Sequence, residues 1–303
     1  MRWLSALLPS LALASLGQAV VGPGTVTGNT AVHDPTMCKD KDGTYFVFST
    51  AVGIEIRTSK DRTAWTLIGK VWPNGAPWTD QYTGTSNGNL WAPDCTYLNG
   101  EFLLYYAASS FGSQNSAIFF AKSSTGQPGS FSNLGLVTST SSSNNYNVDG
   151  SNWLLSLGSF WTGIKEMSVS SSTGKLSSNT VTALAQRTAN NGAIEASVIF
   201  KNANYYYLFS SWDNCCQGVN STYNIRVGRS TKATGGFVDK SGVALTSGGG
   251  TLVLGTHDNI VGPGGQDLMV DGDGPILIYH YYTPSGSFLG INRLDFSSGW
   301  PVS

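Results

Sequence analysis

Two acidic residues stand out because each lies in a stretch that carries little other charge. Glu195 lies within the run Asn-Asn-Gly-Ala-Ile-Glu-Ala-Ser-Val-Ile-Phe, which is apolar and β-prone. A carboxylate buried in such a stretch is costly, so the group favours its protonated form. Asp34 lies in His33-Asp34-Pro35. Either residue alone fits an ordinary acid at a strand end. As a pair they suggest a glycoside hydrolase, which uses one carboxyl as acid and the other as base.

The first residues resemble an export signal. A basic start at Met1-Arg2-Trp3 precedes an apolar run over residues 4–16, and Gly17-Gln18-Ala19 places small residues at the last and third-last positions. The apolar run is too short to cross a bilayer. We therefore predict a signal peptide over residues 1–19, cleaved after Ala19, and a single secreted domain over residues 20–303.

Composition limits the function further. The net charge is −1 and only 12% of the residues are charged, which argues against a nucleic-acid-binding protein. With 37 Gly, 9 Trp and 13 Tyr, the chain fits an extracellular all-β protein that binds a neutral ligand. Asn220-Ser221-Thr222 is an N-glycosylation sequon. No interface pattern is evident, so we expect a monomer.

Four cysteines, Cys38, Cys95, Cys215 and Cys216, allow three disulfide pairings in a secreted chain. Their spacing fits no common zinc motif. We favour Cys38–Cys95, because each follows an Asp-containing turn, together with a vicinal Cys215–Cys216 bridge. A buried pair of free thiols is the alternative for the vicinal residues.

Short β-prone runs alternate with turns rich in Gly, Ser, Asn and Asp, and no amphipathic helix is evident. The runs recur as hairpins at the spacing of propeller blades, which predicts one all-β domain, a β-propeller, with a β-sandwich as the alternative. The expected strands cover residues 44–49, 53–58, 101–107, 116–121, 153–157, 196–200, 205–210, 224–229 and 276–282.

Several short motifs occur in a distinctive order. They include His33-Asp34-Pro35, Leu90-Trp91-Ala92-Pro93-Asp94, Ser110-Phe111-Gly112-Ser113-Gln114, Tyr146-Asn147, Gly158-Ser159-Phe160-Trp161-Thr162-Gly163, Ile194-Glu195-Ala196 and Gly262-Pro263-Gly264-Gly265-Gln266. Each motif alone is weak, but the ordered set resembles the fungal arabinan endo-1,5-α-L-arabinosidases of glycoside hydrolase family 43. The resemblance covers residues 20–303.

This resemblance implies a five-bladed β-propeller that hydrolyses α-1,5-linked arabinan with inversion. Asp34 matches the general base and Glu195 the general acid, whose carboxyl groups stand about 6.5–9.5 Å apart in inverting enzymes. The positions expected to contact substrate are Gly112, Asn147, Ser159, Phe160 and Trp161, together with Asp34. The rings of Phe160 and Trp161 also fit a second interpretation, as propeller core.

The chain departs from the family at a third carboxylate. The family pattern Asn-Ala-Ile-Asp-Pro-Asn supplies an aspartate that tunes the acid, whereas here Tyr146-Asn147 runs directly into Val148-Asp149-Gly150. Asp149 is therefore either a substitute pKa modulator or an ordinary turn residue. An error in the gene sequence would also explain the missing segment.

Glycoside inversion needs no cofactor, and we expect none. Some relatives place a metal-ligating histidine in the loop where this chain has Gly265. A metal ion in the central channel is therefore a secondary expectation, with His257 as its candidate ligand. His33 and His280 are expected to be core or supporting residues.

Two alternatives to an endo-acting arabinanase stay open. One is an exo-acting arabinofuranosidase or β-xylosidase on the same scaffold, which differs in having a blocked pocket instead of an open groove. The other is an arabinan-binding protein that has lost turnover, which the missing third-aspartate segment favours. In each case the expected partners are arabinan and arabino-oligosaccharides, with neither nucleic acid nor membrane involved.

Overall fold

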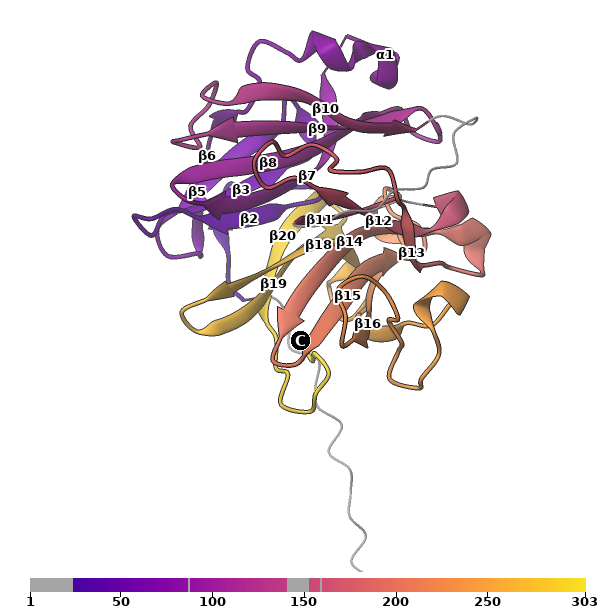
Figure 1. The fold of residues 1–303 in the computed structure, drawn as a ribbon. Coiled ribbons are helices and arrows are strands. Elements are labelled where there is room, and N and C mark those ends of the chain that lie inside the picture. Colours follow the sequence, from indigo (N-terminus) through magenta and orange to yellow (C-terminus); the bar gives the residue numbers. More distant parts are fainter. Residues whose placement is uncertain (1–23, 87, 141–152, 159) are drawn as a thin grey trace, which may run out of the picture.

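The computed structural model describes residues 24–86, 88–140, 153–158 and 160–303. These residues form five β-sheets arranged around a common centre (Figure 1). Strand β2, β7, β11, β14 or β18 lies innermost in each sheet, and contacts join β2 to β7, β11 to β14, β14 to β18, and β18 back to β2. The predicted five-bladed β-propeller is confirmed, and the β-sandwich is excluded.

Each blade is a mainly antiparallel sheet whose strands follow one another along the chain. Blade 1 contains β2 (Thr36–Lys39), β3 (Tyr45–Ser49), β5 (Glu55–Ser59) and β6 (Ala64–Lys70), with β1 (Thr27–Gly28) parallel to β6. Blade 2 contains β7 (Asn89–Leu98), β8 (Glu101–Ser109), β9 (Ser116–Ser123) and β10 (Ser132–Thr140), and β4 (Ala51–Val52) pairs with β7.

Blade 3 contains β11 (Trp153–Leu157), β12 (Ile164–Val169) and β13 (Thr182–Ala185). Blade 4 contains β14 (Ile194–Asn202), β15 (Tyr205–Trp212), β16 (Asn224–Ser230) and β17 (Thr251–Leu254). Blade 5 contains β18 (Val261–Asp271), β19 (Gly274–Thr283) and β20 (Gly286–Arg293). All nine strands expected from the sequence are present.

Helical structure in the described ranges is limited to single turns. They are η1 (Pro77–Thr79), α1 (Asp80–Thr83), η2 (Phe160–Thr162), η3 (Asn190–Gly192), η4 (Gly218–Asn220) and η5 (Leu245–Ser247). None of the helices in this part of the chain is long and apolar enough to span a membrane. The predicted signal peptide lies outside the described residues.

The hydrophobic core is divided among the interfaces between blades. Side chains alternate across a strand, so one strand can serve two interfaces. In β8, Phe102 and Leu104 join the cluster between blades 1 and 2, whereas Leu103 joins the cluster between blades 2 and 3. In β19, Leu277 packs toward blade 4 and Ile278 toward blade 1. This alternation explains why the strands are apolar on both faces.

The N-terminal segment closes the ring. Residues 24–32 run along the outer edge of β20, where the amide of Gly24 donates to the carbonyl of Ile291 and the amide of Leu289 donates to the carbonyl of Thr30, both at 2.9 Å. The residues on either side of β1 thus bind the outer edge of β20, while β1 itself pairs with β6, so the segment joins blade 5 to blade 1. These contacts cover backbone groups on the outer edge of β20 that would otherwise be exposed to solvent.

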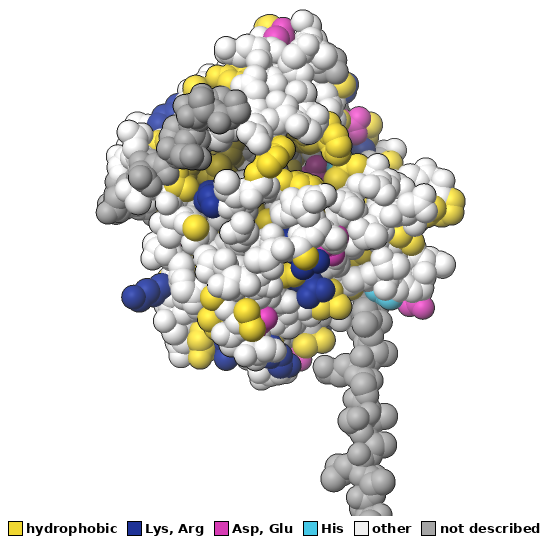
Figure 2. All heavy atoms as spheres, turned by 90° about the vertical axis from the view of Figure 1, so that its right-hand side faces the viewer, with side chains coloured by type: hydrophobic (Ala, Val, Ile, Leu, Met, Phe, Trp, Pro, Cys, Tyr) yellow, Lys and Arg dark blue, Asp and Glu magenta, His cyan; other side chains and the backbone are white. Residues whose placement is uncertain are grey.

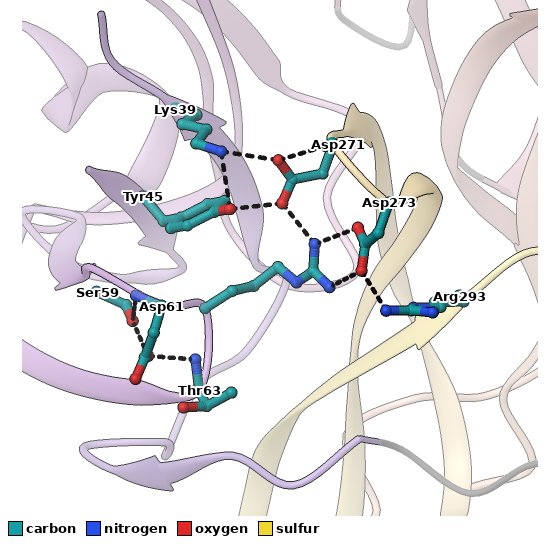
Figure 3. Close-up of polar contacts among 10 residues, drawn as sticks. Lys39, Tyr45, Ser59, Asp61, Thr63, Asp271, Asp273 and Arg293 are labelled. Carbon is teal, nitrogen blue, oxygen red and sulfur yellow. Dashed lines mark hydrogen bonds and ion pairs between the residues drawn. The ribbon is translucent and has the colours of Figure 1, made fainter. Parts of the chain in front are cut away.

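A charged network reinforces the seam between blades 1 and 5 (Figure 3). Asp271 accepts hydrogen bonds from the ammonium of Lys39 at 2.8 Å and the hydroxyl of Tyr45 at 2.6 Å, and it pairs with Arg62. Arg62 also binds Asp273 through two parallel hydrogen bonds of 2.8 and 2.7 Å. The Asp271 side chain is only 5% exposed, so these contacts are shielded from solvent.

Two disulfides are formed. Cys38 on β2 bonds to Cys95 on β7, which ties the inner strands of blades 1 and 2. Cys215 bonds to Cys216 in the loop that follows β15. Both favoured pairings are confirmed.

We predict that Arg62→Ala lowers the free energy of unfolding by about 2 kcal/mol, because Asp271 and Asp273 each lose a shielded partner. Urea unfolding at neutral pH measures the change. Lys41→Ala is the matched control, since the Lys41–Asp42 pair is 71% and 67% exposed and such pairs contribute about 0–1 kcal/mol. Equal effects from the two variants would contradict a stabilising role for the seam network.

Candidate active site

Asp34 lies shortly before β2 and is held in place by hydrogen bonds of its backbone amide as well as of its side chain. Its φ of 45° is uncommon for a residue other than glycine. In this conformation its amide donates to Nδ1 of the buried His280, at 3.0 Å. A strained conformation of this kind persists where the surroundings fix it, and such positions concentrate at functional sites.

The Asp34 carboxylate is ionised through specific partners. Its Oδ2 accepts from the Thr50 hydroxyl at 2.8 Å and lies 3.0 Å from Nδ1 of His33. Burial raises the pKa of Asp34, but attraction to His33 and these hydrogen bonds outweigh burial and bring the pKa to about 2. Because Oδ2 is occupied by two donors, Oδ1 is the oxygen left to accept a proton from water.

Glu195 is positioned by an irregularity at the start of β14. The register of β14 against β15 shifts between Glu195 and Val198, and Ala196 has a φ of 50°. The amide group of Gln266 donates to the Ala196 carbonyl, and the Ser211 hydroxyl donates to Gln266 Oε1 at 2.6 Å. A bulge re-aims the side chains beside it, here under the control of a buried glutamine.

The pKa of the Glu195 carboxyl shifts in the opposite direction from that of Asp34. Burial raises its pKa, and the negative charge of Asp34 acts in the same direction. The hydroxyl of Tyr223 donates to Oε1 of Glu195 at 2.6 Å, which opposes the rise, as does attraction to His33. The net shift is upward, as predicted from the apolar sequence around Glu195.

Two glycines of β18 pack against groups of this site. A Cβ on Gly265 would approach Asp34 Oδ1 to 2.5 Å, and Gly265 has a φ of 56°. A Cβ on Gly264 would lie 2.0 Å from the ring of Tyr223, which holds Glu195. Only glycine lets the strand pass this close to both groups. The Gly-rich motif therefore has a steric function at the centre of the site.

Two histidines flank Asp34. The rings of His33 and His280 stack with centroids 3.9 Å apart, and a nitrogen of each lies within hydrogen-bonding distance of the Tyr282 hydroxyl. Burial disfavours a charge on His33, but Asp34 outweighs burial and raises its pKa. Burial and repulsion by His33 lower the pKa of His280 to about 3, against the attraction of Asp34, so His280 is neutral.

His33, Asp34 and His280 bring potential ligand atoms within 4.8 Å of one another. Both ring nitrogens of His280 and of His33 already have partners within the protein. Bound metal would have to displace those contacts, and we assign no step to one. No group of three possible ligands among the described residues includes His257, whose Nδ1 lies 3.2 Å from Asp258.

The predicted substrate loops lie partly in the described chain. Phe160 and Trp161 form η2, which contacts η3 just before Glu195, and Trp161 is 48% exposed. This exposure argues against the core interpretation for Trp161. Gly112 is exposed in the β8–β9 hairpin beside Phe111, which is 81% exposed. Asn147, Asp149 and Ser159 lie outside the described residues.

On the face drawn in Figure 2, hydrophobic side chains gather around a recess in the upper half, while most of the Lys and Arg side chains lie below or beside it. A surface of this kind suits a neutral ligand that is held by rings and hydrogen bonds.

Sequence reasoning missed several residues of the site. Thr50 contacts Asp34 and Tyr223 contacts Glu195, whereas Tyr282 contacts His33 beside Asp34. Nothing in their local sequence marks these three residues. His280 was assigned to a strand, which is correct, but its contact with Asp34 was not foreseen. One signal was available: a histidine inside the apolar strand Ile-Leu-Ile-Tyr-His-Tyr-Tyr needs a polar partner.

Fungal and bacterial relatives resemble this chain over nearly its whole length. It is 40% identical to a probable arabinan endo-1,5-alpha-L-arabinosidase A of Aspergillus terreus, over 97% of each chain. It is also 40% identical to the extracellular endo-alpha-(1->5)-L-arabinanase 1 of Bacillus subtilis, over 90% of this chain and 88% of the relative.

Solved structures share the fold over the same range. A family 43 endo-arabinanase from Bacillus licheniformis superposes with a TM-score of 0.84 at 37% identity, covering 92% of this chain and 99% of the other. An exo-1,5-alpha-L-arabinanase from a bovine ruminal metagenomic library gives a TM-score of 0.81 at 33% identity, covering 90% and 96%. Residues 24–301 match the glycosyl hydrolases family 43. Together with the paired carboxyls at the propeller centre, these similarities show that the chain belongs to glycosyl hydrolase family 43.

Proposed function

We propose that this protein is a secreted arabinan endo-1,5-α-L-arabinosidase that works with inversion. The observation that carries the proposal is that two carboxyls of one site are shifted in opposite directions, with the pKa of Asp34 lowered to about 2 and that of Glu195 raised. One ionised and one protonated carboxyl is what hydrolysis of a glycosidic bond requires. The endo-arabinanase relatives support arabinan as the substrate.

In this mechanism Asp34 is the general base. Its free Oδ1 takes a proton from water, which attacks the anomeric carbon on the face opposite the leaving group. Oδ2 stays with Thr50 and His33, which keep the carboxylate ionised and in one orientation.

Glu195 is the general acid and gives its proton to the glycosidic oxygen as the bond breaks. Tyr223 donates to the carboxyl and can stabilise the carboxylate that remains. Before the next turnover, solvent takes the proton from Asp34 and returns one to Glu195.

Sugar recognition rests on uncharged contacts. The exposed rings of Phe111 and Trp161 and the exposed Gly112 are candidates for contact with arabinofuranose units, because faces of furanose rings can pack on aromatic rings. Asn147 and Ser159 remain part of this proposal from the family motifs alone. Asp149 remains the candidate modulator of the Glu195 pKa.

The remaining predictions complete the proposal. Residues 1–19 act as a cleaved export signal, and residues 20–303 form one catalytic domain that works as a monomer. The extracellular relative from Bacillus subtilis supports secretion.

Hydrolysis of linear debranched arabinan, with products resolved by chromatography, tests the function directly. We expect a broad set of short arabino-oligosaccharides early in the reaction, because endo cleavage falls inside the polymer. Arabinose or one short product released alone from the start would indicate the exo mode that one structural relative has. Binding without any release would indicate the arabinan-binding alternative.

We predict that Asp34→Asn and Glu195→Gln each lower kcat at least about 100-fold while oligosaccharide binding is largely kept, since each removes one proton-transfer group. Steady-state kinetics and calorimetric binding measure the two effects. Asp42→Asn and Glu101→Gln, at exposed surface ion pairs, are isosteric controls. Normal turnover in either site variant would refute its assignment.

Tyr223→Phe is expected to move the alkaline limb of the pH profile of kcat/KM to higher pH. The tyrosine hydroxyl lowers the pKa of Glu195, so its removal raises that pKa and keeps the acid protonated over a wider range. The acidic limb, set by Asp34, should stay in place. Tyr205→Phe at the far end of β15 is the control, and a downward shift of the alkaline limb in Tyr223→Phe would disprove the assignment.

A further inference from the structure

The vicinal disulfide lies against the site and has no role in the mechanism described so far. The amide of Cys216 donates to the Tyr282 hydroxyl at 2.9 Å, and Cys216 Sγ lies 3.7 Å from Nε2 of His33. Cys216 has a φ of 66°, an unusual conformation that aims this amide at the tyrosine. The bridge therefore contacts two of the groups that surround Asp34.

The protons in this cluster can be assigned from donors and acceptors. His280 accepts the Asp34 amide at Nδ1, so its neutral ring carries hydrogen on Nε2 and donates to the Tyr282 oxygen, 3.1 Å away. His33 faces the Asp34 carboxylate with Nδ1, which must carry hydrogen because a carboxylate only accepts. In neutral His33, Nε2 is then an acceptor.

The single hydroxyl hydrogen of Tyr282 completes the assignment. It points to Nε2 of His33, 2.9 Å away, because Nε2 of neutral His33 only accepts, whereas the Cys216 amide and Nε2 of His280 only donate. The Ser221 hydroxyl also hydrogen-bonds the tyrosine, and because it already accepts from a backbone amide, its own hydrogen is available to the tyrosine oxygen. Among the described residues, the Cys216 amide is the only backbone group that hydrogen-bonds the Tyr282 hydroxyl.

We propose that the Cys215–Cys216 bridge and Tyr282 are positioning elements of the active site, which fix the tautomers and orientation of His33 and His280 and, through them, the Asp34 carboxylate. The expected fall in kcat rests on the proposed function, whereas the expected histidine tautomers do not depend on it. A bond between adjacent residues removes rotational freedom from the backbone that carries the Cys216 amide, which helps to hold that amide against the tyrosine.

The chain has three histidines, which makes their side chains directly observable. In protein labelled with ¹⁵N-histidine, long-range ¹H–¹⁵N spectra at alkaline pH should show His33 as the Nδ1–H tautomer and His280 as the Nε2–H tautomer. In Cys215→Ser/Cys216→Ser and in Tyr282→Phe, both signals should shift toward averaged tautomers. His257, which lies outside the cluster, is the internal control. Signals of His33 and His280 that stay unchanged in the disulfide variant would overturn the proposal.

Kinetics on debranched arabinan test the link to Asp34. Loss of the bridge should lower kcat between about 10-fold and about 100-fold, as displacement of a catalytic group does, with KM nearly unchanged. Tyr282→Phe should have a similar effect. The combined variant should be no slower than Tyr282→Phe alone, because residues in one chain of contacts are not additive.

Other outcomes distinguish a failure of the positioning role from a failure of the proposed function. A raised KM with normal kcat, or effects that multiply in the combined variant, would mean that the bridge contacts sugar instead and would overturn the positioning role. If the wild-type protein releases nothing from arabinan, the proposed function fails, and the histidine spectra still decide the tautomers. Mild reduction of the wild type is a second route to the same state, since Cys38 and Cys95 are buried whereas Cys216 is exposed.

Discussion

Each blade of the propeller must be buried on both faces, and most of the structure follows from this constraint. A strand inside the ring has no solvent side, so its alternating residues go to two different interfaces, as Phe102 and Leu103 do in β8. The chain needs no helical layer, because blades cover blades. Polar chemistry is then confined to the inner strands and the loops that connect them.

The site is built from places where regular strand geometry breaks down. Asp34 lies before β2 with a positive φ, Glu195 adjoins a bulge in β14, and Gly265 lets β18 pass beside Asp34. A regular ladder would satisfy these backbone groups with one another. Here the irregular amides and carbonyls bind side chains such as His280 and Gln266 instead, which fixes the carboxyls through buried hydrogen bonds.

Local sequence was sufficient for the nine strands that it named, because short β-prone runs between turns have few other stable arrangements. It did not name the innermost strands β2, β7 and β18. The local sequence also indicated the raised pKa of Glu195, since the apolar residues around Glu195 predict that its carboxyl is buried. The number of blades came from resemblance to a family and not from the pattern itself. Tyr282 was not foreseen because its contact with His33 depends on ring closure. Thr50 and Tyr223 reach the two carboxyls from loops of the same blade as the carboxyl that each contacts, and the strand pattern does not predict the course of these loops. A single sequence shows how apolar and polar residues alternate along a strand, but it does not show which blade packs against that strand.

The N-terminal segment completes the last blade to be synthesised. Residues 24–32 find their partners in β20 only after nearly all of the chain has been made. Loop closure over such a separation is entropically expensive, so we expect this pairing to form late in folding. Until then the edge of β20 is an unpaired strand that another chain can bind. The pairing of the N-terminal segment with β20 closes the native ring, and its late formation is therefore the folding step at which pairing with another chain is most favoured.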